Sequence, residues 1–302
     1  MVYIYFTVNN TILNYFSILY QISLKGKVIE KNTITSIAIG GFDGMHLAHQ
    51  KLFSKLGTNG GIIVIQTHYA NLSPVMYRKK YTNYPLYFYP LTNIKHLTGI
   101  QFVKLLEEEF PNLEKIVVGY DFHFGHQAAY NCNDLATLFK GIVEIVDEFK
   151  LDGISIHSKA IRAYLRDGDI QKANKMLGHN YCLTGLCIQG QGLGKKQFVP
   201  TININVLDFL IPQEGIYLTK TKIKDRDYNS ITFIGHRVTT DGKFAVETHI
   251  LSDNFMQEIP KNIEIEFLKK TRNNIKYDKF EDLKKQIEED IKNALVWFGE
   301  NR

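Results

Sequence analysis

Two histidines that follow a glycine-rich turn are the clearest candidates for chemistry in this chain of 302 residues. The turn contains Gly40, Gly41 and Gly44, and it leads into His46 and His49, which begin a segment with helical spacing of apolar residues. The first amides of a helix have no partner within the helix, and the helix dipole is positive there. The stretch therefore predicts an anion site flanked by two imidazoles. The plainer alternative is a tight turn with two surface histidines.

The elements that would position these histidines are short buried strands. Apolar runs at residues 37–39, 60–65 and 116–118 predict three of them, and the first precedes the turn. We expect the helix after the turn to continue to Leu56 and to end at Gly57. Strand, helix and strand in this order predict a parallel sheet, in which ligands bind beyond the carboxyl ends of the strands.

A second glycine-rich segment offers another anion site. Gly190, Gly192, Gly194 and Lys195 follow an apolar run, and residues 200–203 come directly after them. Glycines let backbone amides curl around oxyanions, and the lysine adds positive charge. The spacing does not fit the Walker A pattern of nucleotide-binding loops.

The chain changes character near residue 180. Before this point strands alternate with helices, whereas after it short strands are separated by turns, at residues 183–188, 216–223, 231–234, 244–251 and 263–268. An amphipathic helix is predicted at residues 279–298. We therefore predict an α/β fold with two domains: a Rossmann-like domain over residues 1–180, and a small antiparallel β-barrel with a C-terminal helix over residues 181–302.

Composition excludes several classes of protein. The hydrophobic fraction of 44% and the charged fraction of 22% are typical of a globular chain. The net charge of +5 comes without a dense Lys/Arg block, so we expect no nucleic-acid partner. The three cysteines form no metal-binding spacing, which favours a reduced, cytoplasmic compartment.

The first 24 residues are rich in apolar and aromatic side chains, so a membrane role must be considered. Asn9, Asn10, Asn14 and Gln21 interrupt this stretch, and it has no basic start. We therefore expect neither a targeting segment nor a membrane span.

Residues 36–50 resemble the HxGH signature of the nucleotidylyltransferase superfamily. More closely, they resemble a block of the bacterial bifunctional riboflavin kinase/FMN adenylyltransferase (FAD synthetase) family. This chain departs from the family at Ala48, where the family has glycine, and at Gly41, where it usually has asparagine. Further family blocks follow in the same order, so that the resemblance covers residues 37–290. Any single block is a weak signal, whereas the ordered set is strong.

The resemblance implies roles for the residues of the first domain. His46, His49 and Arg162 would hold and neutralise the triphosphate of ATP as catalytic residues. Further contacts to ATP and its phosphates would come from Gly40, Phe42, Asp43, Gly44 and Ser158. The flavin would be contacted by His68, Asp121, Phe122 and Phe124, and in the second domain by Arg237 and Arg272. Plainer roles for these residues are a loop histidine, core phenylalanines and, for Ser158, an ordinary N-cap.

The resemblance also implies a kinase site in the second domain. Thr201 and Asn203 would bind Mg²⁺ and the ATP phosphates, with Gly190, Gly192, Gly194 and Lys195 as the phosphate loop. Glu247 would be the general base that accepts the proton of the riboflavin 5′-hydroxyl, and its plainer role is that of a solvent-facing strand residue.

The expected function is the phosphorylation of riboflavin to FMN, followed by adenylylation of FMN to FAD, with ATP as co-substrate. This chain departs from the family pattern at Ala48 in the first domain and at Phe198 and Val199 in the second. These departures keep open the alternative that only one activity is retained. A non-catalytic flavin-binding protein is a second alternative, and a basic RNA-binding barrel is a weaker third. The expected partners are the small molecules riboflavin, FMN and ATP, and the expected state is a monomer or a weak oligomer.

Overall fold

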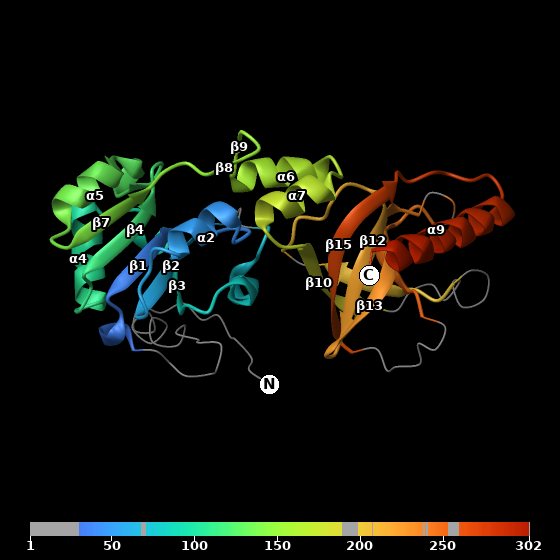
Figure 1. The fold of residues 1–302 in the computed structure, drawn as a ribbon, viewed down its shortest axis with the longest axis horizontal. Coiled ribbons are helices and arrows are strands. Elements are labelled where there is room, and N and C mark those ends of the chain that lie inside the picture. The colour runs from blue at the N-terminus through green and yellow to red at the C-terminus, as the bar shows by residue number, and fades with distance from the viewer. Residues whose placement is uncertain are drawn as a thin grey trace. The chain divides into compact units, whose positions relative to one another are not determined.

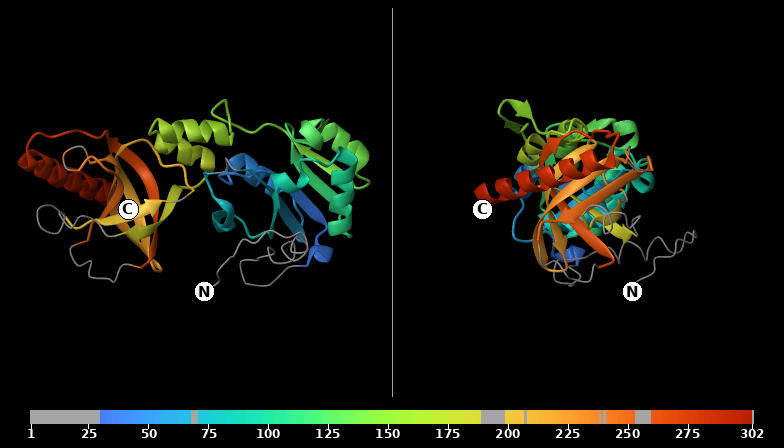
Figure 2. Two further views of the ribbon diagram at one scale, coloured as in Figure 1. Left: turned by 180° about the vertical axis from the view of Figure 1, so that it is seen from behind. Right: turned by 90° about the vertical axis from the view of Figure 1, so that its right-hand side faces the viewer.

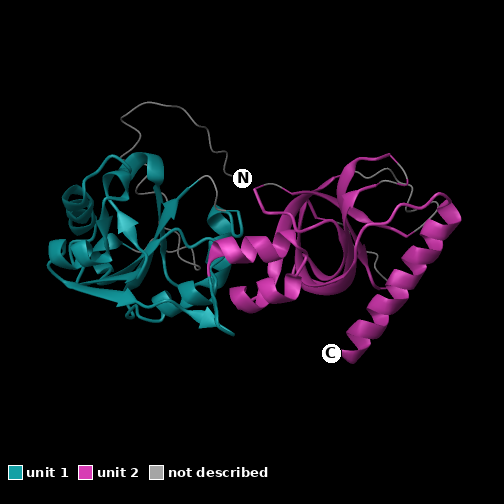
Figure 3. Ribbon diagram, turned by 90° about the horizontal axis from the view of Figure 1, so that it is seen from above, with its two compact units in different colours: residues 1–156 teal, residues 157–302 magenta. Residues whose placement is uncertain are grey.

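The computed structural model describes residues 30–67, 71–188, 199–206, 208–237, 239, 241–252 and 260–301. The chain divides into two compact units, residues 1–156 and 157–302 (Figure 3). The helices α6 (Ser158–Arg166) and α7 (Ile170–Leu177) belong to the second unit. Asn174 of α7 donates its side-chain amide to the carbonyl of Phe267 at 2.8 Å and accepts the amide of Tyr181 at 2.8 Å. The functional boundary between residues 180 and 181 stays a prediction.

The first unit is built on a parallel sheet of five strands in the order β3-β2-β1-β4-β7 (Figure 1). These strands are β1 (Ser36–Gly40), β2 (Gly60–Gln66), β3 (Leu86–Pro90), β4 (Lys115–Gly119) and β7 (Ile142–Val146). The central strand β1 is buried along nearly its whole length because both faces of the sheet are covered.

Helices cover the two faces of this sheet (Figures 1 and 2). On one face α2 (Leu47–Phe53) buries Leu52 and Phe53 against Ala38 and Val64 of the sheet. On the other face α4 (Gly99–Glu109) and α5 (Cys132–Leu138) pack on β1, β2 and β4, with Phe102 and Leu106 of α4 in the core. The predicted Rossmann-like layering is confirmed.

Two details differ from the sequence-based expectation. The helix after the glycine turn ends at Phe53 rather than at Leu56, because the amides of Lys55 and Leu56 bond back three residues and close a tighter turn. The unpatterned stretch after β2 forms the 3₁₀ helix η2 (Val75–Tyr81) and the edge strand β3, then α3 (Leu91–Ile94). The smaller elements are η1 (Lys31–Thr33), β5 (His123–Phe124), η3 (His126–Ala128), β6 (Tyr130–Asn131), β8 (Lys150–Leu151) and β9 (Ile154–Ser155).

The second unit contains a closed antiparallel barrel in the order β10-β11-β14-β13-β12-β15. Its strands are β10 (Tyr181–Ile188), β11 (Ile202–Val206), β12 (Gly215–Ile223), β13 (Arg226–His236), β14 (Phe244–Ile250) and β15 (Asn262–Arg272). The predicted barrel is confirmed. Strand β11 was not predicted, although Ile202, Ile204 and Val206 alternate with polar residues as they do in a half-buried strand.

The barrel strands divide their side chains between an interior and an outer face. On β14, Val246 and Thr248 are buried in the interior, whereas Glu247 points to the other face. On the outside, α9 (Phe280–Glu300) packs Ala294 and Phe298 against Leu218 of β12 (Figure 1). Within the described residues, no helix is both long and apolar enough to cross a membrane.

We predict that Phe298→Ala lowers the free energy of unfolding by about 3–5 kcal/mol, because it removes a buried ring between α9 and the barrel. Phe298 is 6% exposed, whereas Leu295 on the same helix is 52% exposed. The control Leu295→Ala is expected to change stability by no more than about 0.5 kcal/mol. Urea unfolding followed by circular dichroism measures both variants, and equal effects would contradict the assigned packing face of α9.

Candidate active sites

The first candidate site lies where β1 ends in the first unit. Strand β1 pairs with both β2 and β4, so the sheet order reverses there, which is where open α/β sheets bind ligands. His46 is the N-cap residue of α2 and is buried, and His49 lies within the first turn. Their rings stack with 3.5 Å between centroids and 20° between planes. The structure thus brings the two predicted histidines together at the predicted edge.

The glycine turn holds a strained backbone. Phe42 and Met45 both have a φ of 46°, and Gly44 has a φ of 87°. A non-glycine residue in this region costs about 1–3 kcal/mol, so surrounding contacts must compensate. Phe42 supplies one of them, because its ring meets the rings of Phe53 at 4.9 Å and His49 at 5.1 Å, both edge-on.

The buried carboxylate of Asp43 is the main contact that stabilises the turn. It accepts hydrogen bonds from the amides of Asn71, Leu72 and Ser73, at 3.0–3.2 Å. In return, the amide of Gly44 donates to the Ser73 hydroxyl at 2.8 Å. The turn after β1 is thereby joined to the loop after β2. This role differs from the predicted contact between Asp43 and ATP, which stays a prediction.

Arg78 lies behind the turn and is 1% exposed. Its Nε donates to the carbonyl of Phe42 at 3.2 Å, and its Nη2 lies 3.9 Å from Oδ1 of Asp43. Burial lowers the pKa of Arg78, and the negative charge of Asp43 opposes that shift. Gln50 adds bonds from its side-chain amide to the carbonyls of Met45 and Tyr81, at 3.0 and 3.2 Å. Sequence reasoning missed Arg78, because nothing in the pattern around it distinguishes it from the neighbouring lysines.

The segment after β4 reaches the same edge of the sheet as the histidines. Asp121 is exposed there, and Phe122 is half-buried. Phe124 is buried in the core and stacks on Phe122 with 5.6 Å between centroids and 13° between planes. Phe122 therefore keeps some of the exposure that a flavin contact needs, whereas Phe124 serves the core. The remaining predicted flavin residue of this unit, His68, lies outside the described residues.

Ser158 and Arg162 lie on α6, in the second compact unit. The prediction that Ser158 caps this helix is wrong, because His157 occupies the N-cap position and Ser158 is the first helical residue. Arg162 lies one turn later. Their predicted contacts to the ATP phosphates stay a prediction.

The second candidate site lies on the outer face of the barrel. Asn203 on β11 is directly opposite Glu247 on β14, so their side chains share a face. The hydroxyl of Thr201, two residues earlier, is hydrogen-bonded to Glu247. The three predicted residues of the kinase site are thus brought together. The glycines and the lysine predicted to complete it, Gly190, Gly192, Gly194 and Lys195, lie outside the described residues.

Glu247 is a half-buried carboxylate with a cationic partner. Nη1 of Arg237 lies 3.1 Å from Oε1 of Glu247, and Nε of Arg237 lies 3.1 Å from Oδ1 of Asp241. Burial raises the pKa of Glu247 above its ordinary value, and Arg237 acts against that shift. A raised pKa brings a carboxylate closer to the range in which it can accept a proton near neutral pH.

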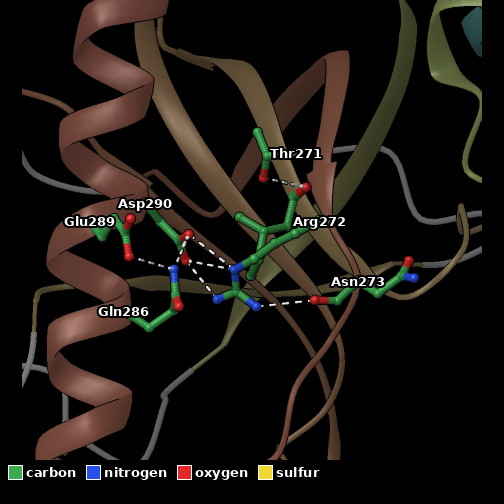
Figure 4. Close-up of polar contacts among 7 residues, drawn as sticks. Thr271, Arg272, Asn273, Gln286, Glu289 and Asp290 are labelled. Atoms are coloured by element: carbon green, nitrogen blue, oxygen red, sulfur yellow. Dashed lines mark hydrogen bonds and ion pairs between the residues drawn. The ribbon is translucent and has the colours of Figure 1, made fainter.

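Arg272, which was predicted to contact the flavin, is held by the C-terminal helix (Figure 4). Its Nε and Nη2 meet the carboxylate of Asp290 at 2.6–3.1 Å, and its Nη1 donates to the carbonyl of Asn273 at 3.0 Å. The side-chain amide of Gln286 reaches the same carboxylate at 3.2 Å. This paired fork ties the end of β15 to α9. A flavin contact by Arg272 stays a prediction.

Two sets of side chains offer metal ligands within the described part of the chain. Cys182, Glu264 and Glu266 have donor atoms within 4.8 Å of one another. Lys222 and Lys220 stand directly opposite the two glutamates in the pairing of β12 with β15, and these cations lie on the strand next to the carboxylates. Thr201, Asn203 and Glu247 instead offer only oxygen donors, the type that Mg²⁺ prefers.

Comparison with known proteins agrees with this geometry. Residues 177–298 match the Flavokinase family model, which describes riboflavin kinases. The bifunctional riboflavin kinase/FMN adenylyltransferase of Haemophilus influenzae is 28% identical, with 87% of this chain and 94% of that protein covered. The enzyme of the same name from Listeria monocytogenes is also 28% identical, with 87% and 92% covered. These matches confirm the resemblance that the sequence motifs indicated.

A solved structure supports the same fold. It is described as a macrolide-efflux protein from Streptococcus pneumoniae and is 25% identical to this chain, with a TM-score of 0.76. The match covers 88% of this chain and 98% of that one. The two architectures, an α/β unit and a barrel unit, therefore occur together in a chain of known structure.

We predict that Asp43→Asn and Arg78→Met each destabilise the protein by about 3–5 kcal/mol, because each leaves a buried group without its charged partner. The double variant should lose less than the sum of the two, since it removes both charges. Urea unfolding gives the coupling energy, and hydrogen exchange at the amides of residues 71–73 should quicken in Asp43→Asn. The exposed carboxylate in Asp121→Asn is the control, with an expected change within about 0.5 kcal/mol. Additive single effects would contradict the coupling.

Proposed function

We propose that this chain makes flavin nucleotides in two steps, at two sites. It phosphorylates the 5′-hydroxyl of riboflavin with ATP to give FMN, and it then transfers AMP from a second ATP to FMN to give FAD and pyrophosphate. The observation that carries the proposal is the convergence of Thr201, Asn203 and Glu247 on one face of the barrel, within the residues that match the riboflavin kinase model. The likeness to bifunctional enzymes over 87% of the chain supports the second step.

In the kinase step, Glu247 accepts the proton of the riboflavin hydroxyl as that oxygen attacks the γ-phosphorus of ATP. The bond from the γ-phosphorus to the bridging oxygen breaks, and ADP leaves. Phosphoryl transfer depends mostly on positioning and on charge stabilisation. Arg237 fits a positioning role, because its 3.1 Å contact orients the Glu247 carboxylate and favours its ionised form.

Mg²⁺ fits the same face of the barrel. Thr201 and Asn203 carry a hydroxyl and an amide oxygen on one side of β11, beside a carboxylate, and such neutral oxygen donors complement the phosphate oxygens of ATP. We propose that these two residues hold the ion together with ATP. When bound, Mg²⁺ neutralises the charge of the triphosphate.

In the adenylyl transfer step, an oxygen of the FMN phosphate attacks the α-phosphorus of ATP, and the bond to the departing pyrophosphate breaks. His46 and His49 would stabilise the charge that develops on the triphosphate. Because the amide of Gly44 bonds to Ser73, the imidazoles and the amides at the start of α2 carry more of this role than the glycine turn itself. We keep Ser158 and Arg162 as proposed contacts to the ATP phosphates.

We further propose that the protein acts in the cytoplasm as a monomer or a weak oligomer on these small molecules alone. The alternatives are retention of a single activity, and flavin binding without turnover. Incubation with riboflavin and MgATP, followed by separation of the flavins, distinguishes them. FMN without FAD would leave only the kinase, FAD from added FMN alone would leave only the adenylyltransferase, and binding without either product would contradict the proposal.

We predict that His49→Ala lowers FAD formation from FMN by about 10²-fold or more, since it removes charge stabilisation at the first site. FMN formation from riboflavin should persist. Glu247→Ala should lower FMN formation by about 10²–10⁴-fold, because the general base is lost, while FAD formation from supplied FMN persists. Chromatography of the flavins measures both. The loss of both activities in either folded variant would refute the two-site assignment.

The raised pKa of Glu247 predicts a pH dependence for the kinase step. The ionised carboxylate is the active base, so kcat/KM for riboflavin at saturating MgATP should fall on acidification at a pH above the unperturbed glutamate pKa of about 4.3. Arg237 lowers this pKa, so Arg237→Met should move the acid limb to higher pH, and Arg237→Lys should move it less. A limb that moves to lower pH in Arg237→Met would exclude this role for the Arg237 charge.

A further inference from the structure

Five hydroxyl side chains form a closed ring in the interior of the barrel. Thr219 and Thr221 come from β12, Ser230 and Thr232 from β13, and Thr248 from β14, and each residue is 0% exposed. Thr219 bonds to Ser230 and to Thr232 at 2.8 Å, and Thr221 bonds to Ser230 at 2.8 Å and to Thr248 at 3.1 Å. A bond of 3.0 Å between Thr232 and Thr248 closes the ring.

In this ring the number of hydroxyl hydrogens equals the number of hydrogen bonds, because each hydroxyl has one hydrogen to donate. Five hydroxyls share five hydrogen bonds, so each donates once and accepts once. Thr232 donates to Thr248, and this one direction determines the other four around the ring. Hydrogen bonds that all run in one sense polarise one another and strengthen the network.

The ring adjoins the candidate kinase site through the backbone of β14. Thr248 follows Glu247 directly, and it stands opposite Thr232 on β13 and Ile202 on β11. The pairs Asn203–Glu247 and Ile202–Thr248 join β11 to β14. The register of β14 therefore decides whether Glu247 faces Asn203.

Burial of apolar side chains excludes some registers of β14 but does not by itself exclude all the others. A slip of β14 by one residue would turn Glu247 into the interior, and burial of apolar side chains excludes it. A slip by two residues keeps every side chain on its own face, and a hydroxyl ring is sensitive to it because Thr248 would lose its partners. An unsatisfied buried hydroxyl costs about 1–3 kcal/mol.

We propose that the hydroxyl ring is a register lock that positions Glu247 opposite Asn203, with Thr248 as its principal positioning residue. The effect on catalysis rests on the proposed kinase function, whereas the effect on register does not. Every member acts through β14, and none of the five touches the reacting groups.

The first test compares Thr248→Val with Thr248→Ser. Valine keeps the shape but removes the hydroxyl, so Thr232 loses an acceptor and Thr221 a donor. We expect kcat for FMN formation to fall at least about tenfold, with KM for riboflavin changed less, because misplacement of a catalytic group acts mainly on turnover. Serine keeps the hydroxyl and should restore kcat to within about twofold. FAD formation from FMN is the internal control. Equal kcat values for the valine variant and the wild type would overturn the proposal.

The second test removes the whole ring. Replacing the four threonines by valine and Ser230 by alanine removes every hydroxyl of the ring together with its partners, so the barrel is expected to fold about as stably as before. Backbone NOEs between β11 and β14 should then report more than one register, and kcat should fall. A single native register in this variant would refute the lock, whatever the activity. If the variant does not fold, the same NOEs in Thr248→Val and Thr248→Ser decide. If the wild type shows the native NOEs but no kinase activity, the proposed function is wrong. The comparison of registers between the variants would still hold.

Discussion

A buried carboxylate organises the first unit. Asp43 follows β1 directly, in an environment where an unpaired charge would be costly, and three backbone amides together with Arg78 compensate it. The partners lie 28–35 positions further along the chain, so the carboxylate can be satisfied only if the loop after β2 folds against the turn after β1. The strained φ values at Phe42 and Met45 are tolerated as a result, and the start of α2 is placed with both histidines beside it. The position of the candidate anion site thus depends on one electrostatic requirement.

In the second unit, neutral hydroxyl groups hold the backbone beside the candidate site. Its interior hydroxyls satisfy one another, whereas Glu247 on the outer face has Arg237 and Thr201 as partners. In both units the polar groups that hold the backbone lie behind the residues proposed to meet substrate. This separation keeps the reactive side chains available, because the groups that fix their positions are already paired with one another.

The alternation of strands and helices and the two architectures could be predicted from the sequence because apolar runs are local signals. The runs that became β1, β2 and β4 are continuous, as expected for strands covered on both faces. The histidine pair and the Glu247 strand were also found from short motifs. Strands β3 and β11 were missed, since β3 ends at a proline and β11 is a short alternation beside the glycine-rich segment.

The supporting residues could not be predicted for a different reason. Arg78 and the five hydroxyls acquire their roles only from partners distant in sequence, and an isolated arginine or threonine has no local pattern that shows whether it is buried. The same holds for Arg272, whose partner Asp290 lies on a separate helix. Asp43 was recognised as part of a motif, but its use became visible only with the loop it holds.

The alternation of side chains along β14 has an evolutionary consequence. The interior side chains of this strand are Val246, Thr248 and Ile250, and the outward-facing ones are Glu247 and His249. Neighbouring residues are therefore under different selection pressures. Mutation of the surface set changes the groups that the strand presents without repacking the barrel interior. Mutation of the interior set acts on those groups only through the position of the strand. A lineage could therefore diversify the chemistry of this strand while inheriting its architecture unchanged.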